Sequence, residues 1–207
     1  MHLWSFAKKL LAVRTVSTVR SAPEAFLFLA LMLLILPLKW VGGILLAGMV
    51  HELFHILALC VCGERIYGFT IGAFGAKIET DAIASGKEFV CSLAGPMGGI
   101  SLILLSRWLP CAAICAMFQS LFNLIPVVPL DGGRAVRGLL VWFFGFHRGE
   151  RIYQMVAWGA MGLLFLGGIY IWLRINLGIL PLIAVGILMI RLLGIKIPCK
   201  DGCERVQ

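Results

Sequence analysis

Long apolar runs alternate with short polar stretches along most of the chain. A membrane-spanning helix needs about 20 predominantly apolar residues, with a usable lower limit of about 17. Six runs reach or approach that length: Ala22–Leu38, Trp40–Cys62, Phe89–Ser106, Trp108–Leu130, Met155–Leu173 and Ile175–Ile190. The pattern therefore predicts an all-α polytopic membrane protein with six transmembrane helices.

Two stretches outside these runs have patterns of their own. In residues 1–20, apolar positions fall near one helical face beside four basic residues, which predicts a basic helix lying at the membrane interface. A signal peptide is the alternative, but no small-residue cleavage site follows the apolar run. Residues 67–80 alternate apolar side chains with glycine, which predicts a small membrane-associated β hairpin.

The absence of any repeat, low-complexity tract or soluble segment of domain size favours a single domain over residues 1–207. Within it we expect a six-span core over residues 22–190 and a cytoplasmic tail over residues 191–207. This organisation predicts one compact helical bundle.

Composition supports insertion in a lipid bilayer. Hydrophobic residues make up 61% of the 207 residues and charged residues only 14%, against about 45–50% and 25% in soluble domains. The net charge of +8 raises the question of nucleic acid, but the basic residues are scattered between apolar runs and form no aromatic–basic stripe. We therefore expect no nucleic-acid partner.

The basic residues instead predict orientation. Of the 18 Lys and Arg residues, 15 lie in the N-terminal segment, the 63–88 loop, the 131–154 loop or the C-terminal tail. Positive residues concentrate on the cytoplasmic side of membrane proteins. The pattern predicts a multi-pass plasma-membrane protein with both termini in the cytoplasm, in agreement with an even number of spans.

The seven cysteines predict no disulfide framework, because most lie in apolar runs and their spacing is irregular. Cys60 with Cys62, and Cys199 with Cys203, remain open as metal or redox pairs.

The candidate chemistry lies in the second apolar run. His51 and His55 are four residues apart, so on a helix they share one face and can bind one ion. Glu52 points about 100° away and can act on water as a general base. Ionisable groups this deep in a span cost about 2.5–3.5 kcal/mol each. A divalent cation would satisfy all three side chains. The alternative without a metal is a buried polar cluster that joins helices.

A third protein ligand is expected, because catalytic zinc usually has three. His2 and His147 are poorly placed, so a carboxylate is favoured, and Asp131 follows the stretch that contains Pro126 and Pro129. Those prolines predict a broken helix, which membrane proteins tolerate when it lines a cavity. Asp131 could instead be only a helix N-cap. Asn123, two turns earlier, could donate a hydrogen bond to a substrate carbonyl or oxyanion.

These motifs together resemble the site-2 protease family of intramembrane metalloproteases. The His-Glu-x-x-His motif is at residues 51–55 and the Asn-x-x-Pro-x-x-x-Leu-Asp-Gly motif is at residues 123–132, with an Ala-Gly-Pro element at residues 94–96. The resemblance implies Zn²⁺ ligated by His51, His55 and Asp131, Glu52 as the catalytic residue, and Asn123 in substrate placement. It also implies that the glycine-rich strands lie near the substrate's extended segment.

Six spans and a cytoplasm-facing site are most similar to the branch of the stage IV sporulation protease, which processes a membrane-associated sigma-factor precursor. The short tail after Arg191 departs from that branch, because no CBS domain is expected in it. The predicted function is hydrolysis of a peptide bond in or near a transmembrane segment of a membrane-bound regulatory protein. The alternative is a metal-ion transporter that uses the same ligands; oligomerisation is left open.

Overall fold

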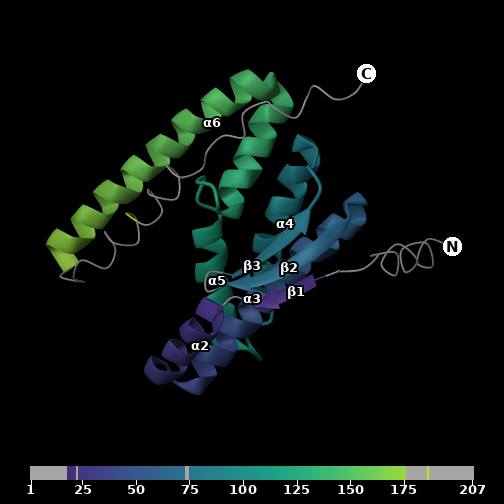
Figure 1. Ribbon diagram of the computed structural model, residues 1–207. Coiled ribbons are helices and arrows are strands. Elements are labelled where there is room, and N and C mark those ends of the chain that lie inside the picture. The colour runs from purple at the N-terminus through teal and green to yellow at the C-terminus, as the bar shows by residue number, and fades with distance from the viewer. Residues whose placement is uncertain (1–17, 22, 73–74, 176–185, 187–207) are drawn as a thin grey trace.

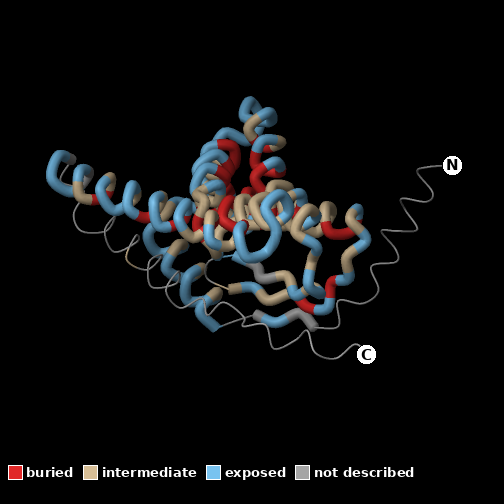
Figure 2. The backbone as a smooth tube through the Cα atoms, turned by 90° about the horizontal axis from the view of Figure 1, so that it is seen from above, coloured by how far each residue is buried: buried red, intermediate tan, exposed pale blue. Residues whose placement is uncertain are grey.

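A computed structural model describes residues 18–21, 23–72, 75–175 and 186 of the chain (Figure 1). The elements are β1 (Thr18–Ser21), α2 (Pro23–Ile35), α3 (Leu38–Cys62), β2 (Ile66–Gly72), β3 (Gly75–Thr80), α4 (Ser85–Leu104), α5 (Pro110–Asn123) and α6 (Asp131–Ile175). The sheet lies on one face of the helical layer, as Figures 1 and 2 both show. The protein is thus mostly helical, with one small sheet.

Three of the described helices are long and apolar enough to cross a membrane, namely α3, α4 and α6. Two predicted spans are shorter than expected, since α2 has 13 residues and α5 has 14. Helix α2 stops before Pro37, because a residue preceding proline is disfavoured in helical conformation. The sixth predicted span, Ile175–Ile190, falls almost wholly outside the described residues. The total of six spans therefore stays a prediction.

The hairpin predicted within residues 67–80 is present, and it gains a third strand. Strands β2 and β3 pair antiparallel, with Phe69 opposite Ile78, and β1 pairs parallel to β2, with Val19 opposite Phe69. The predicted N-terminal helix over residues 1–20 is therefore wrong at its end: residues 18–20 are a strand, because pairing with β2 satisfies their backbone groups. Residues 1–17 lie outside the described part.

The predicted break in the fourth apolar run is confirmed. Helix α5 ends at Asn123 and α6 begins at Asp131, so residues 124–130 form a connecting loop. This loop packs tightly on the first turn of α6, since a Cβ added to Gly133 would fall almost on the backbone of Val127 and Val128. Only glycine permits so close an approach of the two backbones.

The 131–154 segment, expected to be a cytoplasmic loop, is helical instead. It forms the first part of α6, which reverses direction at Gly145, where φ is +74° and ψ is 166°. We call residues 131–144 the outgoing arm and residues 146–175 the return arm; they form the inverted V of Figure 1. Near the bend, Arg137 Nε donates to Glu150 Oε2 at 2.8 Å. This ion pair joins the two arms of α6.

One part of the core lies where α3, α4 and α5 meet. Two other buried clusters lie between the connecting loop and α6 and between α3, β2 and α4. Ala47 of α3, Leu102 of α4 and Ala116 of α5 form one buried cluster. Glycines let these helices approach closely: a Cβ on Gly98 would lie 2.8 Å from the Phe54 ring. Small residues at such interfaces are typical of membrane helices, whose association depends on close packing.

Candidate metal centre

Three side chains converge halfway along α3. His51 Nε2 lies 2.9 Å from Asp131 Oδ2 and 3.2 Å from His55 Nε2, and His55 Nε2 lies 3.2 Å from Asp131 Oδ2. His51 and His55 share one helical face, whereas Asp131 comes from the first residue of α6. The side chains are only 4%, 12% and 13% exposed for His51, His55 and Asp131. The structure thus brings together all three residues that the sequence nominated as ligands.

The protonation of His55 tests whether a cation fits this triangle. His55 Nδ1 lies 2.7 Å from the carbonyl oxygen of Cys91. A carbonyl can only accept, so Nδ1 carries the hydrogen and Nε2 of the neutral ring presents a lone pair. That lone pair faces another imidazole nitrogen and a carboxylate oxygen. A metal ion would accept lone pairs from all three atoms, the two imidazole nitrogens and the carboxylate oxygen. The Cys91 carbonyl orients the His55 ring, as outer-shell groups do at metal sites.

The spacing of the triangle also suits zinc. Ligand atoms about 2.0–2.1 Å from a tetrahedral zinc lie ~3.3 Å from one another. The three observed separations of 2.9–3.2 Å are close to that value. Two imidazoles and one carboxylate also match the donor set of a catalytic zinc site, which keeps a fourth position open. His51, His55 and Asp131 therefore form a group that could hold a metal ion.

The other two candidates of the sequence analysis border the triangle. Asn123 ends α5, and its Nδ2 lies 3.1 Å from His51 Nε2, so the amide borders the ligand triangle. Glu52 points toward the hairpin, because its Oε1 would lie 3.4 Å from a Cβ added to Gly75. Glu52 therefore lies between the candidate metal centre and the first residue of β3.

Gly95 completes the site, and the sequence analysis gave it no role of its own. A Cβ on Gly95 would lie 2.6 Å from His51 Nε2 and closer still to His55 Nε2. Helix α4 thus passes directly against the ligand nitrogens, at the middle of the Ala-Gly-Pro element. The signal was the run of small residues Gly95, Gly98 and Gly99, which marks a close helix contact but not which residue faces a ligand.

Replacing Gly95 by alanine should lower metal affinity by about tenfold or more, since both histidine rings must move to admit the methyl group. The matched control is Gly86→Ala in the same helix, where the nearest atom would be 3.7 Å from the new Cβ. Chelator competition on the two purified variants provides the measurement. Equal affinities would show that the histidine cluster tolerates this displacement.

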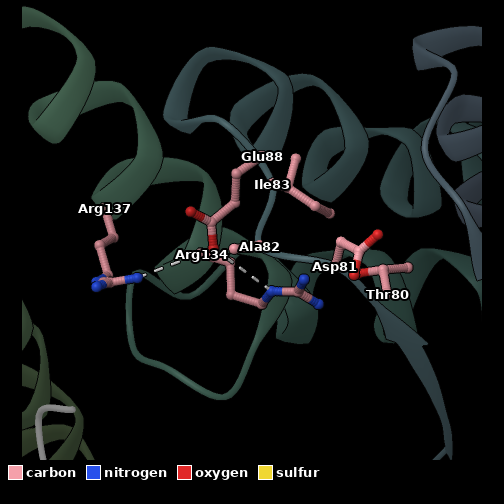
Figure 3. A pocket seen from close by; sticks show the side chains of 7 residues that line it. All are labelled: Thr80, Asp81, Ala82, Ile83, Glu88, Arg134 and Arg137. Carbon is pink, nitrogen blue, oxygen red and sulfur yellow. Dashed lines mark ion pairs between the residues drawn. The ribbon is translucent and has the colours of Figure 1, made fainter. Parts of the chain in front are cut away.

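A polar cavity of about 270 Å³ lies beside the start of α6. Its lining residues are Thr80, Asp81, Ala82, Ile83, Glu88, Arg134 and Arg137. Figure 3 shows Arg134 and Arg137 on either side of Glu88, each 4.0 Å from Glu88 Oε1. The Tyr67 hydroxyl donates to Asp81 at 2.7 Å, and this hydrogen bond raises the pKa of Tyr67. Charged groups thus surround the outgoing arm just after Asp131.

Comparison with solved structures places this architecture in the fold of the site-2 proteases. The Site-2 Protease from Methanocaldococcus jannaschii superposes with a TM-score of 0.59 at 20% identity, over 83% of this chain and 87% of that one. The fold and the His–His–Asp centre together define a membrane protein of site-2 protease architecture with a buried metal-type site.

Two curated proteins are similar in sequence. A Synechocystis protein named "Putative zinc metalloprotease" is 27% identical over an alignment 181 positions long, which covers 75% of this chain and 45% of the relative. A zinc metalloprotease of Methanocaldococcus jannaschii is 28% identical over an alignment 116 positions long, which covers 49% of this chain and 34% of the relative. The chain thus spans less than half the length of either. No family model matches. The similarities support a relationship to the zinc metalloprotease and site-2 protease family, in line with the zinc expected from the sequence.

Proposed function

We propose that this protein is an intramembrane zinc metalloprotease that hydrolyses a peptide bond in or near a transmembrane segment of another membrane protein. The observation that carries the proposal is the convergence of His51, His55 and Asp131 within 3.2 Å, with Glu52 next to His51 on an apolar helix. Names of relatives with related sequences support the same chemistry. Zinc held by these three ligands would leave one position open for the reaction.

Each residue has a distinct part in this proposal. When bound, zinc supplies a Lewis acid that makes water a nucleophile near neutral pH. Glu52 takes the proton from the attacking water and later passes it to the leaving amine. Asn123, at the edge of the ligand triangle, hydrogen-bonds the substrate carbonyl as its oxygen gains charge. The Cys91 carbonyl keeps the His55 ring in the orientation that presents Nε2.

The substrate must lose helical structure around the cleaved bond, because a helical carbonyl is shielded by its own hydrogen bond. Strand β3 supports a route for that step. It lies at the edge of the sheet, paired on one side with β2, and its Gly75 end is near Glu52. An extended substrate segment pairing with β3 would recover backbone hydrogen bonds while placing a peptide bond near the base.

The cellular setting belongs to the same proposal. The basic residues favour a multi-pass protein of the plasma membrane with cytoplasmic termini, and the domain organisation favours one protease domain. We infer that the substrate is a membrane-bound regulatory protein. Processing of a sigma-factor precursor in sporulation rests on the sequence resemblance alone, since the relatives' names say nothing of it.

Metal removal tests the proposal. The protein purified in detergent should contain about one zinc per chain and cleave a single-span substrate protein. Dialysis against a chelator should abolish cleavage, because no protein group replaces the Lewis acid, and added Zn²⁺ should restore it. Zinc binding without cleavage, together with metal uptake into vesicles that contain the protein, would favour the transporter instead.

A further inference from the structure

The return arm of α6 contributes no side chain to the metal centre, yet one of its faces is buried. Tyr153, Ala157 and Met161 are 4%, 1% and 2% exposed and are spaced by four residues, so they form one stripe of the helix. Met161 packs against Val127 of the connecting loop, with Ile125 and Leu130 around them. The stripe therefore presses on the loop that leads into Asp131.

Within that stripe the Tyr153 hydroxyl accepts a hydrogen bond from the Val128 backbone N–H at 2.8 Å. Pro126 and Pro129 have no N–H, Val127 donates to Ile125 and Leu130 donates to Val127. Among residues 126–130, Val128 is thus the position whose backbone N–H donates to a side chain rather than to a backbone carbonyl. A buried N–H deprived of its acceptor is costly, so this bond fixes the loop backbone.

The loop backbone in turn determines where Asp131 begins α6. Val128 is three residues before Asp131, and the first turn of α6 packs on the loop through Gly133. Arg134 N–H donates to the Leu130 carbonyl at 3.1 Å, which joins loop and helix by a further bond. A shift of Val128 therefore moves the carboxylate of Asp131 relative to His51 and His55.

The part of the return arm that contains Tyr153 is held against the outgoing arm. Glu150, one turn before it, pairs with Arg137 of the outgoing arm at 2.8 Å, and both of these side chains are less than a third exposed. Near the bend, a Cβ on Gly149 would lie 2.6 Å from the Leu140 carbonyl oxygen, so the two arms are in close contact. The return arm can therefore hold the loop in place rather than follow it.

We propose that Tyr153 is a positioning residue, whose buried hydroxyl holds the Val128 backbone and thereby sets the Asp131 carboxylate against His51 and His55. The inference rests on the proposed metal site and is independent of proteolysis. Tyr153 touches neither metal nor substrate; it acts through the loop. Loss of a group that hydrogen-bonds a ligand directly weakens metal binding by about 10–100-fold; Tyr153 acts one step further out, so we expect the lower end of that range.

Tyr153→Phe tests this inference, because it deletes the hydroxyl and keeps the ring in the stripe. The matched control is Tyr170→Phe on the same arm, where the side chain is 63% exposed. Zinc affinity is measured by chelator competition, and the visible spectrum of the Co²⁺-loaded protein reports ligand geometry. We expect Tyr153→Phe to bind zinc about tenfold more weakly with altered Co²⁺ bands, and the control to match the parent protein.

Thermal unfolding of the metal-free variants separates positioning from stability. An unchanged zinc affinity and Co²⁺ spectrum in Tyr153→Phe, whether or not the melting temperature falls, would overturn the inference. Failure of the parent protein to bind zinc at all would overturn the proposed function instead. The two failures are therefore distinguishable within one set of measurements.

Discussion

Glu52→Gln should retain zinc and lose cleavage of a single-span substrate by about 10²–10⁴-fold, the usual contribution of a positioned general base. The amide has the size of the carboxylate but cannot accept the proton. Glu52 is not among the three residues grouped as a possible metal site, so the metal should stay. The measurement pairs zinc content per chain with the rate of substrate cleavage in detergent.

The control for this variant is Glu24→Gln, which changes a carboxylate in the first turn of α2 without touching the centre. It should cleave at the parent rate. If Glu52→Gln also cleaved at that rate, Glu52 would not be the base. Loss of both zinc and cleavage would instead make Glu52 part of the metal-binding group.

Asp131→Ala should weaken zinc binding by more than ~100-fold, since loss of an outer partner alone costs about 10–100-fold. Two imidazoles would remain, whereas catalytic zinc normally has three protein ligands. His51 Nε2 lies closer to Asp131 Oδ2, at 2.9 Å, than to His55 Nε2, at 3.2 Å. Zinc content after gel filtration, measured by metal analysis, is the readout.

Asp81→Ala is the matched control, because it removes a carboxylate outside the ligand triangle. Asp81 lies shortly before α4 and accepts a hydrogen bond from the Tyr67 hydroxyl. Its zinc content should equal that of the parent protein. Circular dichroism should show the same helix content in both variants. An unchanged zinc stoichiometry in Asp131→Ala would remove this residue from the metal centre.

The metal centre could be nominated from sequence to the extent that local geometry determines it. His51 and His55 share a face on any helix, and Pro126 and Pro129 each lack the backbone N–H that a continuing helix would need. Asp131 followed from counting the histidines available. The same residue begins α6, so the two readings of Asp131, ligand candidate and helix start, hold together in the structure.

The features that the sequence did not predict depend on contacts between segments that are distant in the chain. Gly95 and the Cys91 carbonyl reach the histidines only because α4 docks against α3, and no periodicity within α4 indicates that register. The 131–154 segment was expected to be a cytoplasmic loop because it lies between two apolar runs and contains four basic residues. In the structure Arg137 and Glu150 neutralise each other across the bend at Gly145, which no single helix pattern reveals.

The separation of the ligands along the chain has a consequence for biosynthesis. His51 and Asp131 are 80 residues apart, and α4 and α5 lie between them. While the chain is being made, α3 enters the bilayer carrying two imidazoles and a carboxylate, before the third ligand exists. Under the proposed ligand set, a chain that ends before Asp131 has only two of the three ligands, so firm zinc binding and any hydrolysis would require the later helices.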